Sequence, residues 1–186
     1  MELELSPDKI AALARRIDRP VVLVGMMGVG KTSVGRRLAA ALDLPFIDAD
    51  DEIVHAAQMS IPEMFERFGE DYFRDGERRV IARLIGQGRG VVSTGGGAFV
   101  NPETRALILA QGITVWLDSE IEVLLDRVGR NSNRPLLQTG DPRETLTRLR
   151  AERESTYAEA PIHVKSGPGP HNRAVQMVLR GLDEWL

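Results

Sequence analysis

The chain of 186 residues contains no cysteine, which excludes disulfides and thiolate metal sites and leaves the redox compartment open. Its three histidines are scattered without the spacing of metal ligands. No apolar run approaches the roughly 20 residues that cross a bilayer, and the N-terminus lacks the apolar segment of a secretory signal. The net charge of −3 gives no bias towards nucleic acid or anionic membranes. We therefore expect a cytoplasmic protein with no nucleic-acid or membrane partner.

The chain also lacks repeats, linkers and low-complexity tracts. Its length suits one domain with a sizeable core, and 42% hydrophobic with 27% charged residues is an ordinary globular mixture. Strand-like and helix-like segments alternate, which implies a parallel sheet covered by helices on both faces. We predict a single α/β domain over residues 1–186 with a leading helix within residues 1–19. The predicted strands are 21–24, 44–47, 90–93, 113–117 and 162–165.

The strongest pattern lies in residues 20–42. An apolar run ends in GMMGVGKT (residues 25–32) and a helical pattern follows, so G-x-x-x-x-G-K-[ST] occurs between a strand and a helix, as it must. The glycines allow positive φ and bring backbone N–H groups to an anion, which the helix N-terminus also favours. Lys31 supplies charge for the outer phosphates, and the Thr32 hydroxyl can bind Mg²⁺. Eight positions in the correct context favour a nucleoside-triphosphate site over a plain glycine-rich turn with a surface lysine.

Two carboxylates follow the second predicted strand. Asp48 and Asp50 lie at its C-terminal end, where open α/β sheets keep their ligands. Both would face one side if the extended geometry continued beyond the strand. The structural alternative is helix capping by Asp50 or Asp51.

Three further features have both a structural and a functional interpretation. Arg74 and Glu77 could share a helix face, and taken alone they would form a weak surface ion pair. Three consecutive glycines at residues 95–97 suit a place where something lies flat against the backbone, or a tight turn. Residues 127–137 contain three arginines without helical or strand periodicity, which indicates solvated charge or a mobile lid that brings arginines to phosphates.

The class of nucleotide-binding protein follows from the rest of the chain. No Asn/Thr-Lys-x-Asp sequence follows the fourth or fifth predicted strand, which disfavours a guanine-specific GTPase. No apolar run ends in the Asp-Glu pair of an ATPase. The carboxylates instead come one strand–helix unit after the phosphate loop, as in small-molecule and nucleotide kinases.

Six motifs in order make a family resemblance specific: GMMGVGKT (25–32), FIDAD (46–50), FRDGE (73–77), GGGA (95–98), RPLL (134–137) and ERESTY (152–157). From about Val21 to the C-terminus the chain resembles the shikimate kinases. The resemblance implies a three-layer nucleoside-monophosphate-kinase fold with a five-stranded parallel sheet and a mobile lid at about 129–141. It also implies substrate-binding helices at about 50–90. The implied activity is ATP- and Mg²⁺-dependent phosphorylation of the shikimate 3-hydroxyl, in the route to aromatic amino acids, by a monomer.

The resemblance also assigns roles to residues. A carboxylate calls for bidentate guanidinium groups, and a positioned carboxylate can accept the proton of the attacking hydroxyl. The acid substrate would contact Asp50, Arg74, Gly95, Gly96, Gly97 and Arg153, with Glu77 holding Arg74. The metal would be held by Thr32, Asp48 and Ser93. ATP would contact Gly28, Val29, Gly30, Lys31, Thr32, Ser33, Arg127, Arg130, Arg134 and Arg173. Catalysis would depend on Asp50, Lys31 and Arg134.

Two assignments stay open within this set. The glycine- and proline-rich turn at residues 166–173 leaves open whether Arg173 is the adenine neighbour. Either Arg127 or Arg130 could face ATP.

Two other functions compete with this interpretation. A gluconate-type kinase of the same fold would accept a flexible sugar acid, which the set Asp50, Arg74, residues 95–97 and Arg153 disfavours. A non-catalytic ligand-sensing module would normally be fused to a DNA-binding segment and would tend to lose a catalytic residue. Here about 20 residues precede the first predicted strand, and Lys31 and Asp50 are both present.

Overall fold

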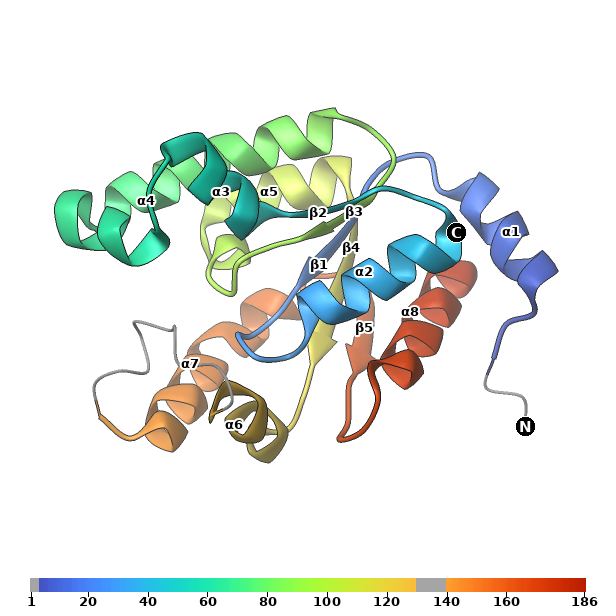
Figure 1. Cartoon of the computed structure of the whole chain (residues 1–186). Coiled ribbons are helices and arrows are strands. Elements are labelled where there is room, and N and C mark those ends of the chain that lie inside the picture. Colours follow the sequence, from blue (N-terminus) through green and yellow to red (C-terminus); the bar gives the residue numbers. More distant parts are fainter. Residues whose placement is uncertain (1–3, 130–139) are drawn as a thin grey trace.

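All five strands run parallel in one sheet of order β2-β3-β1-β4-β5 (Figure 1). The computed structural model describes residues 4–129 and 140–186. Because β1 is the central strand, the loop that follows it lies in the middle of the sheet's C-terminal edge, where ligands of such sheets bind. The strands are β1 Val21–Val24, β2 Phe46–Asp48, β3 Val91–Ser93, β4 Ile113–Asp118 and β5 Ile162–Lys165.

Helices cover both faces of the sheet, so the predicted three-layer architecture is confirmed (Figure 1). On one face α2 packs against α8, and α1 packs on both of them. On the other face α5 packs on β4, with α4 and the short helix η1 against it. The helices are α1 Pro7–Arg16, α2 Lys31–Leu42, α3 Ala49–Ala57, α4 Ile61–Gly86, η1 Ala98–Val100, α5 Pro102–Gln111, α6 Ile121–Gly129, α7 Pro142–Tyr157 and α8 His171–Trp185.

The core lies on the central strands. Every residue of β1 and β4 is buried, as expected for parallel strands covered on both faces. At the edge, β5 alternates: Ile162 and Val164 are buried, whereas His163 and Lys165 are exposed. The predicted strands 21–24 and 162–165 have the observed bounds, and the other three differ by one or two residues.

Local capping explains where several helices begin. Ser6 caps α1 with Pro7 in its first turn, and Ser60 forms a capping box with Glu63 at the start of α4. Within α4, Gly69 has the non-helical angles φ 82° and ψ 175°, so the helix is interrupted there. Its two parts pack with α3 around a small second core of Ile53, Met64 and Phe73.

One local prediction was wrong. The side chain of Asp48, rather than of Asp50 or Asp51, caps α3 by accepting a hydrogen bond from the Asp50 N–H at 3.0 Å. The strand therefore ends at Asp48, and alternation does not carry on to Asp50.

Most of the predicted lid falls on residues 130–139, which lie outside the described residues. Of the described part, Gly140 and Asp141 lead into α7, and Asp141 caps this helix. In the described part of the chain, no helix is long and apolar enough to span a membrane.

Candidate active site

The loop between β1 and α2 is built on glycines in left-handed conformations. Gly28 and Gly30 have φ of 80° and 100°, and Gly30 is the residue at which α2 is capped. Gly25, with φ of 138°, lies against the backbone of β4, where an added Cβ would come within 2.2 Å of the Leu117 carbonyl oxygen. The turn therefore brings the N-terminus of α2 to the sheet edge, which suits an anion.

Lys31 begins α2 and turns back across this loop. Its Nζ donates hydrogen bonds to the carbonyl oxygens of Gly25 at 2.8 Å and Met26 at 3.0 Å. The residue is only 8% exposed. The ammonium group is therefore held at the mouth of the loop, beside the backbone that would receive a phosphate.

Three elements, α2, β2 and β3, place an oxygen-bearing side chain at the C-terminal edge of the sheet. The Thr32 hydroxyl of α2 donates to the Asp48 Oδ2 at 2.6 Å. Asp48 at the end of β2 pairs in register with Ser93 at the end of β3, which is buried. Two hydroxyls and a carboxylate are hard ligands that fit Mg²⁺, which usually takes its remaining ligands from water and phosphate. Among the described residues, no group of three or more His, Cys, Asp or Glu side chains could hold a metal ion.

Residues 95–97, after β3, are approached closely by charged side chains. A Cβ added to Gly95 would lie 2.9 Å from both the Asp50 Oδ1 and the Glu77 Oε1. A Cβ added to Gly97 would lie 2.4 Å from the Arg74 Nη2. The side chains of α3 and α4 therefore lie directly against this loop, and a larger residue at either position would have to displace them.

The Arg74–Glu77 pair on α4 is not the weak surface pair that the alternative interpretation would give. Arg74 Nη1 donates to the Glu77 Oε2 at 2.7 Å, and its Nη2 donates to the Glu70 Oε1 at 3.4 Å. Glu77 is 2% exposed, and its Oε1 has no hydrogen-bond partner. Burial raises the pKa of Glu77, and the adjacent Arg74 opposes this shift. The pair therefore fixes the guanidinium beside Gly97.

A second arginine reaches the same loop from α7. Arg153 Nη1 donates to the Gly96 carbonyl oxygen at 3.3 Å, and the Tyr157 hydroxyl donates to the same oxygen. The structure thus brings Asp50, Arg74 and Arg153 together around the three-glycine loop from three different helices. An added Cβ on Gly96 would lie 3.1 Å from the Met27 backbone nitrogen, so this loop also adjoins the phosphate loop.

On the other side of the phosphate loop, Arg127 of α6 donates to the carbonyl oxygens of Val29 at 2.8 Å and Gly167 at 3.1 Å. Partial burial lowers the pKa of Arg127. Arg173 lies exposed on the first turn of α8. Of the two candidates for the nucleotide contact, Arg127 is thus placed beside the loop, whereas Arg130 and the predicted catalytic residue Arg134 lie outside the described residues.

Sequence reasoning missed His171 at this position. A Cβ added to Gly30 would lie 3.0 Å from its imidazole Cε1. Burial, and then Arg127 and Arg37, lower the pKa of His171, and its Nδ1 is buried without a hydrogen-bond partner. In the sequence, only its position at the end of the glycine- and proline-rich turn could have indicated that His171 lies beside the phosphate loop. A single histidine at such a position matches no known motif.

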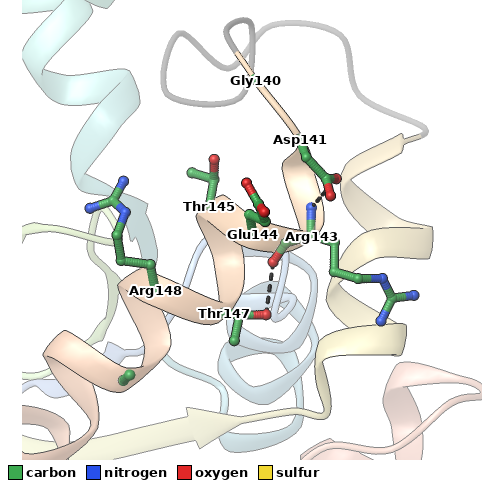
Figure 2. A pocket seen from close by; sticks show the side chains of 8 residues that line it. Gly140, Asp141, Arg143, Glu144, Thr145, Thr147 and Arg148 are labelled. Carbon is green, nitrogen blue, oxygen red and sulfur yellow. Dashed lines mark hydrogen bonds between the residues drawn. The ribbon is translucent and has the colours of Figure 1, made fainter.

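A hollow of about 640 Å³ on α7 is a separate feature (Figure 2). None of its lining residues is one of the predicted site residues, and they come from the two residues before α7 and the first ten residues of this helix. They are Gly140, Asp141, Arg143, Glu144, Thr145, Thr147, Arg148 and Ala151.

Known proteins resemble this chain over nearly its whole length. Residues 27–182 match the family model described as shikimate kinase. A shikimate kinase of Novosphingobium aromaticivorans is 62% identical over 186 residues, covering 98% of this chain and 96% of the relative. A solved shikimate kinase of Acinetobacter baumannii, in complex with shikimate, is 36% identical with a TM-score of 0.85, covering 90% of this chain and 95% of that one.

The same fold also occurs in a kinase with another substrate. A solved gluconokinase from Sinorhizobium meliloti covers 91% of this chain and 94% of its own, with a TM-score of 0.60. At 19% identity this likeness shows the fold alone. The family model and the 62% identical relative are specific where the fold is not: the chain belongs to the shikimate kinase family.

Proposed function

We propose that this protein transfers the γ-phosphoryl group of ATP to the 3-hydroxyl of shikimate, giving shikimate 3-phosphate in the route to aromatic amino acids. One observation carries the proposal. Arg74 and Arg153 flank the three-glycine loop beside Asp50, and this loop adjoins the phosphate loop through Gly96. A small hydroxy acid and a triphosphate would therefore meet at one point of the sheet edge.

The phosphate loop would bind ATP. Backbone N–H groups of Gly28, Val29 and Gly30, together with the start of α2 at Ser33, would surround the β- and γ-phosphates. Lys31 would exchange its bonds to the loop carbonyls for phosphate oxygens. Phosphoryl transfer depends mainly on positioning and charge neutralisation, so this lysine is a catalytic residue of the proposal.

The oxygen set beside the loop would hold Mg²⁺. Thr32 would bind the ion directly, while Asp48 and Ser93 would hold its water ligands. When bound, the ion would neutralise charge on the phosphates. The contact of 2.6 Å between the Thr32 hydroxyl and Asp48 keeps these oxygens at one place.

The acid substrate would lie against the three-glycine loop. Arg74 and Arg153 would bind its carboxylate, because guanidinium groups match carboxylates with paired hydrogen bonds. Asp50 would orient the attacking hydroxyl and accept its proton. The carboxylate of Asp50 lies close enough to Gly95 to face a ring resting on that backbone.

The remaining arginines would serve the nucleotide. Arg127, held beside Val29, would contact ATP, and Arg173 would lie near the adenine. Arg134 would stabilise charge on the transferring group, and Arg130 would assist on the nucleotide side; both belong to the proposed lid.

We also propose that the enzyme works as a cytoplasmic monomer without nucleic-acid or membrane partners, which light scattering and fractionation of cells would test.

An ATP-consumption assay with purified protein and Mg²⁺ tests the function. Turnover should require shikimate and should be absent with gluconate at equal concentration. A phosphorylated product with the phosphate on the 3-hydroxyl, identified by NMR, completes the test. Turnover with gluconate alone would support the sugar-acid kinase, and ATP binding without turnover on either acid would support a sensing module.

A further inference from the structure

Tyr157, at the end of α7, is buried in a position that the proposed chemistry does not use. The residue is 1% exposed. Its ring stacks between those of Phe99 in η1, at 6.4 Å, and Trp116 in β4, at 5.9 Å. The ring is therefore fixed against β4 and against η1, which directly follows the three-glycine loop.

The hydroxyl of Tyr157 is the polar end of this fixed ring. It donates to the Gly96 carbonyl oxygen, and Arg153, one helical turn earlier, donates to the same oxygen at 3.3 Å. Burial raises the pKa of Tyr157, so the hydroxyl stays protonated and remains a donor near neutral pH. The two side chains of α7 and the Gly96 carbonyl thus form one small network.

The direction of the Gly96 carbonyl determines more than its own contacts. A trans peptide is planar, so the N–H of Gly97 points opposite to the Gly96 carbonyl oxygen. Gly97 is also the residue against which Arg74 lies. Holding this carbonyl towards α7 therefore orients both the loop backbone and the guanidinium of Arg153.

We propose that Tyr157 is a positioning residue for the acid substrate, whose hydroxyl fixes the Gly96 peptide and the guanidinium of Arg153. The inference rests on the proposed function, because it assumes that the acid binds against residues 95–97. Tyr157 itself acts through its neighbours, without touching substrate. The ring of Tyr157 packs in the core, and its hydroxyl orients the Gly96 peptide and the guanidinium of Arg153.

Tyr157→Phe separates the two contributions, because it keeps the ring and removes one hydroxyl. The KM for shikimate should rise about fivefold to tenfold, as expected for the loss of one buried hydrogen bond. The KM for ATP should stay within about twofold, because the phosphate loop keeps its own contacts with Lys31. An unchanged KM for shikimate in a folded variant, or an equal rise for both substrates, would overturn the proposal.

Thr114→Val is the matched control. Thr114 is fully buried in β4, its hydroxyl has no hydrogen-bond partner, and it lies near the opposite end of the strand from the site. This variant loses a buried hydroxyl of the same core and should leave both KM values unchanged. A rise in the KM for shikimate in the control as large as in Tyr157→Phe would attribute the effect to general loosening and overturn the proposal.

Two further measurements keep the outcome decisive. If Tyr157→Phe fails to fold, Phe99→Leu replaces it, because this variant loosens the packing of the Tyr157 ring but keeps its hydroxyl. It should raise the KM for shikimate and leave the KM for ATP unchanged. An unchanged KM for shikimate would overturn the proposal. Turnover of shikimate by the wild-type protein is measured first. An inactive wild type would reject the proposed function. An active wild type whose variants keep the same KM for shikimate would reject only the role of Tyr157.

Discussion

Glu77 illustrates how burial determines what a charged residue does. A carboxylate that is 2% exposed loses hydration, which is costly unless a partner replaces it. Arg74 is that partner, at 2.7 Å. The same arginine also contacts Glu70, whose side chain is 65% exposed, so its two acidic neighbours differ mainly in burial. Of the two, we expect Glu77 to set the direction of the guanidinium.

Glu77→Gln should therefore raise the KM for shikimate roughly tenfold or more, since a charge-assisted hydrogen bond to Arg74 becomes a neutral one. Steady-state kinetics with each substrate varied in turn measures this effect, and the KM for ATP should not change. Glu70→Gln is the matched control, because an exposed pair contributes little. Equal effects of the two substitutions would show that burial does not distinguish them.

Asp50→Asn should lower kcat by about 10²- to 10⁴-fold, the range for the loss of a general base, while shape at the loop is kept. The dissociation constant for ATP, measured by calorimetry, should be unaffected. Asp51→Asn provides the comparison: its side chain is 76% exposed, and its 4.0 Å contact with Arg36 faces solvent. Turnover of Asp50→Asn close to that of the wild type would exclude Asp50 as the proton acceptor.

Among the elements, the start of α3 combines two functions in one side chain. Asp48 caps the helix through the Asp50 N–H and also receives the Thr32 hydroxyl. Because Asp48 pairs in register with Ser93 at the ends of neighbouring strands, the cap is fixed to the sheet edge. The geometry of the proposed metal site and the start of the helix that carries Asp50 therefore depend on the same residue.

Asp48→Asn and Asp48→Ala separate these functions. Asparagine caps a helix about as well as aspartate, whereas alanine loses about 0.5–2 kcal/mol. In urea unfolding, we expect the asparagine variant to have a free energy of unfolding close to that of the wild type. The free energy of unfolding of the alanine variant should be lower by that amount. Both should need a higher Mg²⁺ concentration for half-maximal activity, because both lack the charge. Unaltered Mg²⁺ dependence in both would remove Asp48 from the metal site.

Elements with local signals were the ones that the sequence predicted well. The strand, glycine-rich turn and helix of residues 20–42 follow from residues a few positions apart, and this order of elements is confirmed. The cap at Asp48 was assigned to the wrong residue because four neighbouring positions include three acidic side chains with equal capping ability. Only the strand's pairing with β3, a long-range interaction, decides where the extended backbone ends.

At the scale of the whole molecule, ligand binding should increase the free energy of unfolding. MgATP at about 100 times its dissociation constant should stabilise the fold by about 2.7 kcal/mol, which raises Tm by about 5–10 °C for a domain of this size. Lys31→Ala should lose most of this shift and abolish phosphoryl transfer. Differential scanning fluorimetry with and without MgATP measures the shift in Tm, and the ATP-consumption assay measures phosphoryl transfer. A variant that retains the full shift would show that Lys31 does not hold the phosphates.

The meeting of residues from distant elements could be anticipated only through family resemblance. Arg74 and Arg153 are far apart in the sequence, and neither helical pattern indicates that both reach the loop at residues 95–97. The near-complete burial of Glu77 and the contact of Tyr157 with Gly96 likewise depend on how α4 and α7 pack. Alternation of strands and helices predicts a parallel sheet, but the strand order is set by pairing across the whole chain.

The contact between Gly25 and β4 has a consequence for how relatives of this protein should be compared. A side chain at Gly25 would collide with the Leu117 carbonyl whether or not a nucleotide is bound. A descendant that had lost its enzymatic activity would therefore still need this glycine in order to fold. Its presence in a diverged homologue is evidence of shared architecture, and retained chemistry must be judged from residues such as Lys31 and Asp50.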